Sequence, residues 1–255
     1  MQETLRGIVL RTVKYGDTSM VVDLFTESHG RQSFMASIVR AKRSVRSKSF
    51  WHPLSMVEFS AEMRPVGGLP RPSDVRTYYN YIDIPFSPVK STLALFLAEF
   101  LSAALREEKE NIPLYRYIES SLQWLDMVDK PIATANFHLA FLMHLSRFIG
   151  IYPNLEWATN NRNRPARGQV NYQLYFDLLA GSYCDRQPPH AHFLRLQEAQ
   201  ALPALFRMDY PTMHLFRLSR QERMRILQVL NEYYRLHVPN FPELKSLEVL
   251  QEFYS

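Results

Sequence analysis

A run of cations without an acidic residue occupies positions 39–48 of the sequence, VRAKRSVRSK. Guanidinium and ammonium groups at such density can bind the phosphates of a polyanion, with affinity that falls steeply with salt and reads little base sequence. A basic run can equally be a solvated face, so its meaning depends on the elements that hold it. The five candidate phosphate ligands are Arg40, Lys42, Arg43, Arg46 and Lys48.

The positive charge of the chain is confined to the same region. Residues 1–80 contain 12 Lys and Arg against 7 Asp and Glu, whereas residues 81–255 contain 18 of each class. The N-terminal third therefore carries the whole formal net charge of +5. A localised excess of this kind is typical of a nucleic-acid-binding surface.

Short apolar runs alternate with turn signals in this N-terminal third. Residues 5–13 alternate in the way of a half-buried strand, and Gly16 and Gly30 stand where the chain must reverse. About five short strands in 80 residues cannot cover a flat sheet, so we predict a small closed β-barrel such as an OB-fold. The basic run would join two strands of that barrel, where such folds bind nucleic acid.

The rest of the chain has helical periodicity. Ser87 and Pro88 suit the start of a helix, and Ser219 with Glu222 forms a capping pattern before another. We predict an α+β fold with two domains: a barrel domain over residues 1–82 and an all-α helical domain over 83–255, with an irregular insertion around 152–211.

Other residues of the barrel segment could extend a nucleic-acid site. Bases stack on exposed aromatic rings, for which Tyr15 in a turn and Trp51 beside the basic run are the candidates. Phe34 and Phe50 lie within apolar strand patterns, so we expect them in the core. Further cations that could lie on the same surface are Arg11, Lys14 and Arg31.

Several segments in order resemble the bacterial RecO family of recombination mediators. RGIVLRTVKYGDTSMVVDLFTESHGR and FWHPLSMVEF resemble its N-terminal domain. HLAFLMHLSRFIGIYPNLE resembles its central helix and following turn, and RLHVPNFPELKSLEVL resembles its C-terminal pattern. The resemblance covers nearly the whole chain, and the order of the segments makes it specific.

The resemblance implies an OB-fold joined to a helical domain without enzymatic turnover or cofactor. It implies binding to single- and double-stranded DNA, ATP-independent annealing of complementary strands, and action with RecR to load RecA. It also implies recognition of the acidic, apolar tail of the single-strand DNA-binding protein. The tail requires an apolar pocket rimmed by cations, which the segments MHLSRF and QERMRIL could each supply.

One departure from the family concerns zinc. Many members hold a zinc ion with four cysteines after the central helix, but this chain has the single Cys184. We therefore predict no metal site. Cys184, His190 and His192 form a conceivable ligand set beside two prolines, and a surface loop is the reading we favour.

The sequence leaves alternative functions open. One is a general OB-fold nucleic-acid-binding module or RNA chaperone without a mediator role, and another is a metal-dependent nuclease. The basic run could also bind an acidic protein partner. No phosphate-binding glycine loop or hydrolase motif is present, which disfavours an enzyme. Without a signal peptide or an apolar membrane-spanning run, we expect a cytoplasmic protein that does not associate with membranes.

Overall fold

The computed structural model describes residues 2–37, 50–63, 68–106, 109–156 and 174–253 of the chain. These residues form two compact units. Unit 1 comprises residues 1–129 and 242–255, and unit 2 comprises residues 130–241. This division differs from the predicted domains because two helices after the sheet, and the last helix of the chain, belong to the same unit as the sheet.

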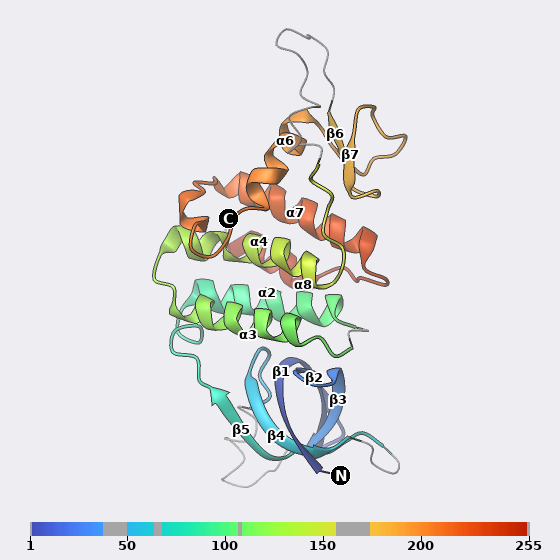
Figure 1. Cartoon of the computed structure of the whole chain (residues 1–255). Helices are drawn as coiled ribbons and strands as arrows, with labels where there is room; N and C mark the ends of the chain where they lie inside the picture. The colour runs from blue at the N-terminus through green and yellow to red at the C-terminus, as the bar shows by residue number, and fades with distance from the viewer. Residues whose placement is uncertain (1, 38–49, 64–67, 107–108, 157–173, 254–255) are drawn as a thin grey trace. The chain divides into compact units, whose positions relative to one another are not determined.

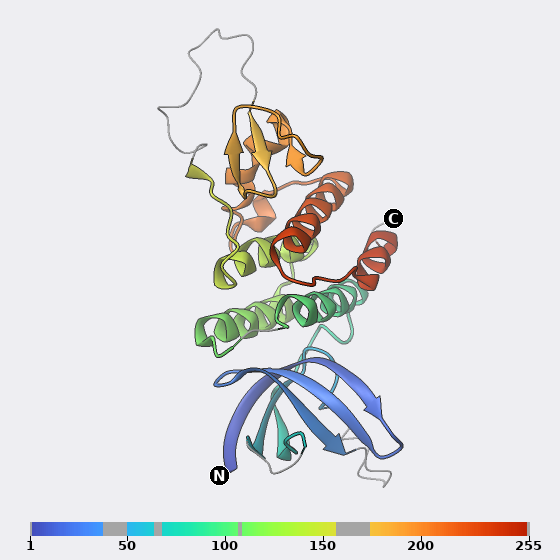
Figure 2. The same ribbon diagram turned by 90° about the vertical axis from the view of Figure 1, so that its right-hand side faces the viewer.

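Unit 1 is built around an antiparallel sheet with the strand order β3-β2-β1-β4-β5. The strands curve round a common interior (Figures 1 and 2). This confirms the predicted small OB-like barrel, although continuous strand pairing does not close the sheet. Its strands are β1 (Gln2–Tyr15), β2 (Ser19–Thr26), β3 (Gly30–Ser37), β4 (Met56–Glu62) and β5 (Ser73–Tyr79).

The turns between the first strands lie where the glycines predict them. Gly16 and Gly30 have φ angles of 67° and 62°, a region that residues with a Cβ atom rarely adopt. Between the open edges, the Met35 N–H donates to the Pro70 carbonyl at 2.9 Å. Pro70 precedes β5, so this bond joins the two ends of the curved sheet at one point.

Both faces of β1 are buried at its middle. Leu5 and Val9 point into the barrel core, where Phe34 and Phe59 meet edge to face at 5.0 Å between ring centroids. Ile8 is also fully buried, although it belongs to the opposite face of the strand. Helix α2 (Pro88–Ala104) contacts β1, and burial on both faces follows from this contact.

The described part of unit 1 also contains the helices α2 (Pro88–Ala104), α3 (Ile112–Met127) and α8 (Lys245–Phe253). Helix α2 begins as predicted, with Ser87 accepting from the Lys90 N–H at 3.5 Å and proline in the first turn. Helix α8 contacts α2, and the Glu99 carboxylate of α2 accepts the N–H groups of Lys245 and Ser246 at 3.1 and 2.7 Å. Glu99 thus satisfies donors at the start of a helix nearly 150 residues away in sequence.

A buried carboxylate holds the segment between β5 and α2. Asp126 accepts the N–H groups of Ile82, Asp83 and Ile84 at 2.8 to 2.9 Å. The buried Lys90 ammonium donates to the carbonyl of Asp126 at 2.9 Å and forms an ion pair with Asp83 at 2.6 Å. Burial raises the pKa of Asp126, but the donated hydrogen bonds outweigh it and leave the pKa below its usual value.

Unit 2 contains the predicted central helix and the capped helix. Helix α4 (Pro131–Phe148) is buried nearly all round and contacts α7 (Arg220–His237). At the start of α7, the Ser219 N–H donates to Glu222 at 2.6 Å and Ser219 accepts from the Glu222 N–H at 3.2 Å. The predicted capping pattern is therefore confirmed.

The described part of the predicted irregular insertion is folded. It contains a small antiparallel sheet in the order β7-β6-β8, followed by helix α6 (Leu196–Leu205) and the short 3-10 helix η2 (Met213–Leu215). We had predicted an all-α region here. The region is not wholly α, because strands of two and three residues pair in it. These strands are β6 (Tyr175–Asp177), β7 (Ser182–Cys184) and β8 (Phe193–Leu194).

Candidate nucleic-acid interface

The predicted phosphate ligands of the basic run lie outside the described residues. The structure describes the chain up to Ser37, at the end of β3, and again from Phe50. The run therefore joins β3 to the segment before β4, as the sequence predicted. The five residues concerned are Arg40, Lys42, Arg43, Arg46 and Lys48.

Arg11 and Arg31 converge on one buried carboxylate instead of forming an open cationic surface. Asp23 is 3% exposed and accepts from Arg11 Nε at 2.6 Å, from an Arg31 terminal nitrogen at 2.9 Å and from Ser33 Oγ at 2.5 Å. Burial raises the pKa of Asp23, but these bonds outweigh it and leave the pKa below its usual value. The other Arg31 terminal nitrogen donates to the Ser102 carbonyl at 2.7 Å.

The two arginines of this cluster differ in access. The Arg31 side chain is 12% exposed and its charge is matched by Asp23, so the structure does not support Arg31 as a phosphate ligand. The Arg11 side chain is 57% exposed and contacts Asp23 through Nε. Arg11 therefore remains a candidate, with an orientation fixed by Asp23.

The last two residues of β1, and not the turn after it, present a cation and an aromatic ring to solvent. The Lys14 side chain is 72% exposed and lies 3.9 Å from the exposed Asp17 carboxylate, and Tyr15 is 64% exposed. Both residues are accessible to a nucleic-acid strand, although successive residues of a strand project to opposite faces. The end of β1 is the described part of the predicted interface that matches the expected chemistry best.

Trp51 is a correction to the predicted stacking residues. Its side chain belongs to the hydrophobic core of the barrel and is only 5% exposed, so no base can stack on it in this structure. Phe34 is fully buried in the same core, and Phe50 is partly buried against it, as expected. Proximity to the basic run in sequence was a misleading signal, because the chain turns inward directly after it.

An aromatic pocket of about 370 Å³ lies where β5 and the start of α2 meet the segment after the basic run. Its volume falls within the range of about 300–1,000 Å³ that is common for small-ligand sites. None of the described residues that line it is acidic. This site was not predicted from the sequence, although the run YYNY at residues 78–81 was a signal for it. The residues used below as the aromatic pocket are Phe50, His52, Tyr79, Asn80, Tyr81 and Ala94.

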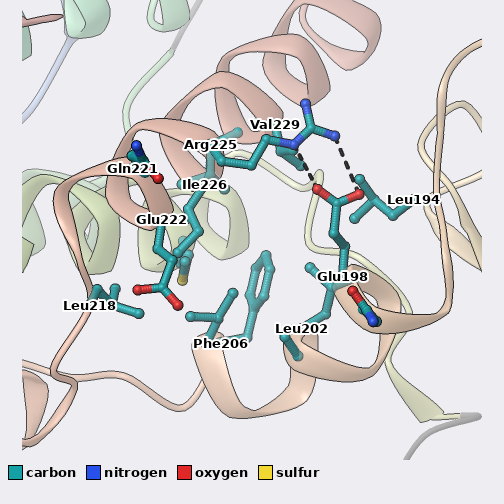
Figure 3. Close-up of a pocket in the computed structure, with 15 residues that line it drawn as sticks. Leu194, Glu198, Leu202, Phe206, Leu218, Gln221, Glu222, Arg225, Ile226 and Val229 are labelled. Carbon is teal, nitrogen blue, oxygen red and sulfur yellow. Dashed lines mark hydrogen bonds and ion pairs between the residues drawn. The ribbon is translucent and has the colours of Figure 1, made fainter.

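Unit 2 contains an apolar groove of about 500 Å³ between α6 and α7 (Figure 3). Its apolar lining includes Leu202, Phe206 and Ile226. Arg225 lies across its rim and binds both oxygens of Glu198, with nitrogen–oxygen distances of 2.6 and 3.3 Å. Met143 from MHLSRF and Arg225 from QERMRIL both line this groove, so the two predicted segments contribute to a single site.

The conceivable metal ligands near Cys184 have other partners. His190 lies 3.4 Å from Asp177 and His192 lies 2.7 Å from Glu232. Burial raises the pKa of the Cys184 thiol, which disfavours the thiolate form that binds metals. Among the residues the structure describes, no three His, Cys, Asp or Glu side chains are grouped to hold a metal ion.

Comparison with known families accounts for nearly the whole chain. Residues 1–81 match the family described as Recombination protein O N terminal, and residues 85–248 match Recombination protein O C terminal. The boundary between these matches coincides with the end of the β5 region.

Full-length relatives agree with this match. Proteins named DNA repair protein RecO from Phocaeicola vulgatus and Bacteroides fragilis are 46% and 44% identical over 255 residues, which is all of this chain and 99 to 100% of theirs. A protein of the same name from Porphyromonas gingivalis is 32% identical over 98% of each chain.

Within the described ranges, no helix is long and apolar enough to cross a bilayer.

Proposed function

We propose that this chain, which belongs to the RecO family of DNA repair proteins, is a cytoplasmic recombination mediator that binds DNA through unit 1. In this role it binds single- and double-stranded DNA, anneals complementary strands without ATP, and acts with RecR to load RecA onto covered DNA. The proposal includes neither catalytic turnover nor a cofactor.

The full-length family match is the observation that carries this proposal. Unit 1 supplies chemistry that suits it, since Lys14 offers an exposed phosphate ligand and Tyr15 an exposed stacking ring. The basic run in the same unit adds five cations. A general nucleic-acid-binding module or RNA chaperone is the alternative, and it would bind strands without recognising mediator partners.

Annealing of complementary single strands without nucleotide tests the DNA-binding part. We expect the wild type to anneal, and a variant with all five cations of the basic run changed to Ala to anneal poorly. Each phosphate contact that is lost lowers the slope of log affinity against log salt by about 0.7 for single strands. Annealing and a salt slope equal to those of the wild type would show that the run is a solvated face.

A second variant controls for charge alone. This variant also loses five positive charges, but from exposed arginines of unit 2. We expect it to anneal nearly as the wild type does. Circular dichroism checks that both variants are folded. The arginines changed to Ala in this control are Arg186, Arg195, Arg207, Arg217 and Arg220.

For the acidic tail of the single-strand DNA-binding protein, we propose the apolar groove as the site. The groove can take the apolar end of the tail, and Arg225 is the basic side chain among its described lining residues. Because Arg225 is bound to Glu198, an acidic group must displace Glu198 before it can pair with Arg225. Glu198 is therefore expected to weaken binding of the tail.

Binding of a fluorescent tail peptide tests this competition. We expect Glu198→Gln to tighten binding about two- to fivefold, since an exposed ion pair contributes at most about 1 kcal/mol, and Arg225→Ala to weaken it. Arg235→Ala on the same helix is the control and should have no effect. Weaker binding in Glu198→Gln would exclude this mode. Peptide binding also separates the mediator from a general nucleic-acid module.

A further inference from the structure

We propose that the aromatic pocket of unit 1 binds one unstacked nucleobase of a single DNA strand. This inference rests on the proposed DNA-binding function and gives it a specific subsite. It differs from the phosphate ligands considered above, because it assigns to this pocket the recognition of a neutral, flat ring.

The lining of the pocket suits a base better than a phosphate. Phe50, Tyr79 and Tyr81 supply ring surface, and the described lining contains no Lys, Arg, Asp or Glu. An anion would find no strong countercharge there, whereas any base has a π face that stacks on aromatic side chains. The lining therefore favours base stacking with little dependence on base identity.

The pocket also has a polar edge with a defined orientation. Thr77 Oγ1 donates to Asn80 Oδ1 at 2.9 Å, so the amide nitrogen of Asn80 is the group left for a ligand. That nitrogen and the imidazole of His52 make no hydrogen bond with any residue in the described ranges. Each nucleobase carries acceptors on its edge, and the Asn80 donor can satisfy one of them once the base is unpaired.

Hydrogen bonds hold the two tyrosine rings in place before any ligand arrives. The Tyr79 hydroxyl donates to Asp126 Oδ2 at 3.1 Å, and the Tyr81 hydroxyl donates to the Leu54 carbonyl at 2.8 Å. The two rings meet edge to face with centroids 5.4 Å apart. Because these side chains are already ordered, a base that enters does not have to order them, which favours binding.

The pocket adjoins the basic run along the chain. Phe50 follows Lys48 by two residues, a separation that can span at most about 7 Å of extended backbone. Covalent geometry therefore ties Lys48 of the run to the pocket. A cation close to stacking surface is the combination that single-strand-binding grooves use.

Filling the pocket tests the proposal without removing its structural hydrogen bonds. Ala94 lines the pocket from α2, so Ala94→Phe would place a ring in the space for the base. Leu95→Phe is the matched control, since Leu95 is 60% exposed on the same helix and does not line the pocket. Asn80→Leu, which removes the edge donor, is a second and independent variant.

Affinities would be measured for oligothymidylate and for an abasic oligomer of equal length and charge. We expect Ala94→Phe to weaken oligothymidylate binding about five- to tenfold, within the range for loss of one stacked base, and to leave abasic binding unchanged. Asn80→Leu should weaken oligothymidylate binding less, and Leu95→Phe should match the wild type. Equal affinities for oligothymidylate in the wild type and both pocket variants would overturn the proposal.

Photocrosslinking locates the base directly. An oligonucleotide that contains 5-iodouracil should crosslink to Tyr79, Tyr81, Phe50 or His52, as read by mass spectrometry of the digested protein. Crosslinks confined to other residues would overturn the pocket as a base site. If the wild type binds no DNA at all, the proposed function fails as well. Wild-type binding without any effect of the pocket variants refutes only the pocket.

Discussion

The aromatic pocket of unit 1 and the apolar groove of unit 2 are concave sites of similar size but opposite chemistry. Among the described residues that line it, the pocket has ring surface and an amide edge but no carboxylate, Lys or Arg, whereas the groove has aliphatic walls and an ion pair across its rim. Stacking surface suits a base, and an aliphatic groove with a displaceable charge suits a peptide. From the two proposals we expect nucleic acid to bind unit 1 and a peptide partner to bind unit 2.

The largest difference between the two sites is expected when the Asp126 carboxylate, which holds Tyr79 of the aromatic pocket, is removed. We expect Asp126→Ala to lower the free energy of unfolding of unit 1 by about 3 kcal/mol, because three backbone donors and the Tyr79 hydroxyl lose a buried charged acceptor. Base binding should weaken while peptide binding in the groove persists. Urea denaturation and the two binding assays measure these effects.

Asp129→Ala is the control for that variant, since Asp129 is an exposed carboxylate three residues further on. It should change neither stability nor binding by a measurable amount. If Asp126→Ala lowered both binding activities equally, the independence of the two sites would be refuted.

As the pH falls, the free energy of unfolding of unit 2 should decrease first. The contribution of Asp126 to unit 1 is lost only at lower pH. Burial and, to a smaller extent, the positive charge of Arg223 together lower the pKa of His138 on α4 to about 3. Between an unfolded pKa near 6.5 and the folded value, only the unfolded state binds the proton. The free energy of unfolding should therefore fall with pH below about 6.5, by up to about 1.4 kcal/mol per unit.

Asp126 responds at lower pH. Because its folded pKa lies below the usual value, its contribution is full above the unfolded pKa of about 4 and is lost as pH falls through the folded pKa. Urea denaturation at pH 7.5 and 5.5 of the wild type and His138→Gln checks the first range. An identical change with pH in both proteins would exclude His138 as the cause.

The smallest expected effect concerns the start of α7, which forms one wall of the groove. Ser219→Ala removes half of the capping box and should lower the free energy of unfolding of unit 2 by about 1 kcal/mol. Peptide binding should weaken slightly and base binding should stay unchanged. Arg220→Ala, at an exposed position beside the cap, should cause no loss, and a loss equal to that of Ser219→Ala would argue against the cap.

The parts of the fold that depend on local chemistry could be predicted from the sequence. Gly16 and Gly30 in the turns, Ser87 before α2 and the Ser219–Glu222 pair follow from short-range preferences that the structure confirms. The strands of the small sheet in unit 2 could not be predicted, because two or three residues are too few to show a period.

The site residues were harder to predict because long-range pairing decides their access. Arg31 was a candidate phosphate ligand, but the register of β2 and β3 allows its side chain to bind Asp23. Trp51 was predicted to be exposed, but its side chain lies in the core of the barrel. Tyr79 and Tyr81 were missed for the opposite reason, since aromatic residues in a strand usually indicate core. The residue types of the candidate interface were visible in the sequence, but tertiary pairing determined which of their side chains a ligand can reach.

The docking of α8 onto α2 has a consequence for synthesis of the chain. Unit 1 is interrupted after residue 129 and is completed only by residues from 242 onward, which Glu99 holds at the first turn of α8. On the ribosome, unit 2 emerges whole while unit 1 still lacks its last helix. A nascent chain therefore exposes the α8-binding surface of α2 until translation is nearly finished. A stop codon just before α8 would remove this helix and so destabilise unit 1, although unit 1 is the first to be translated.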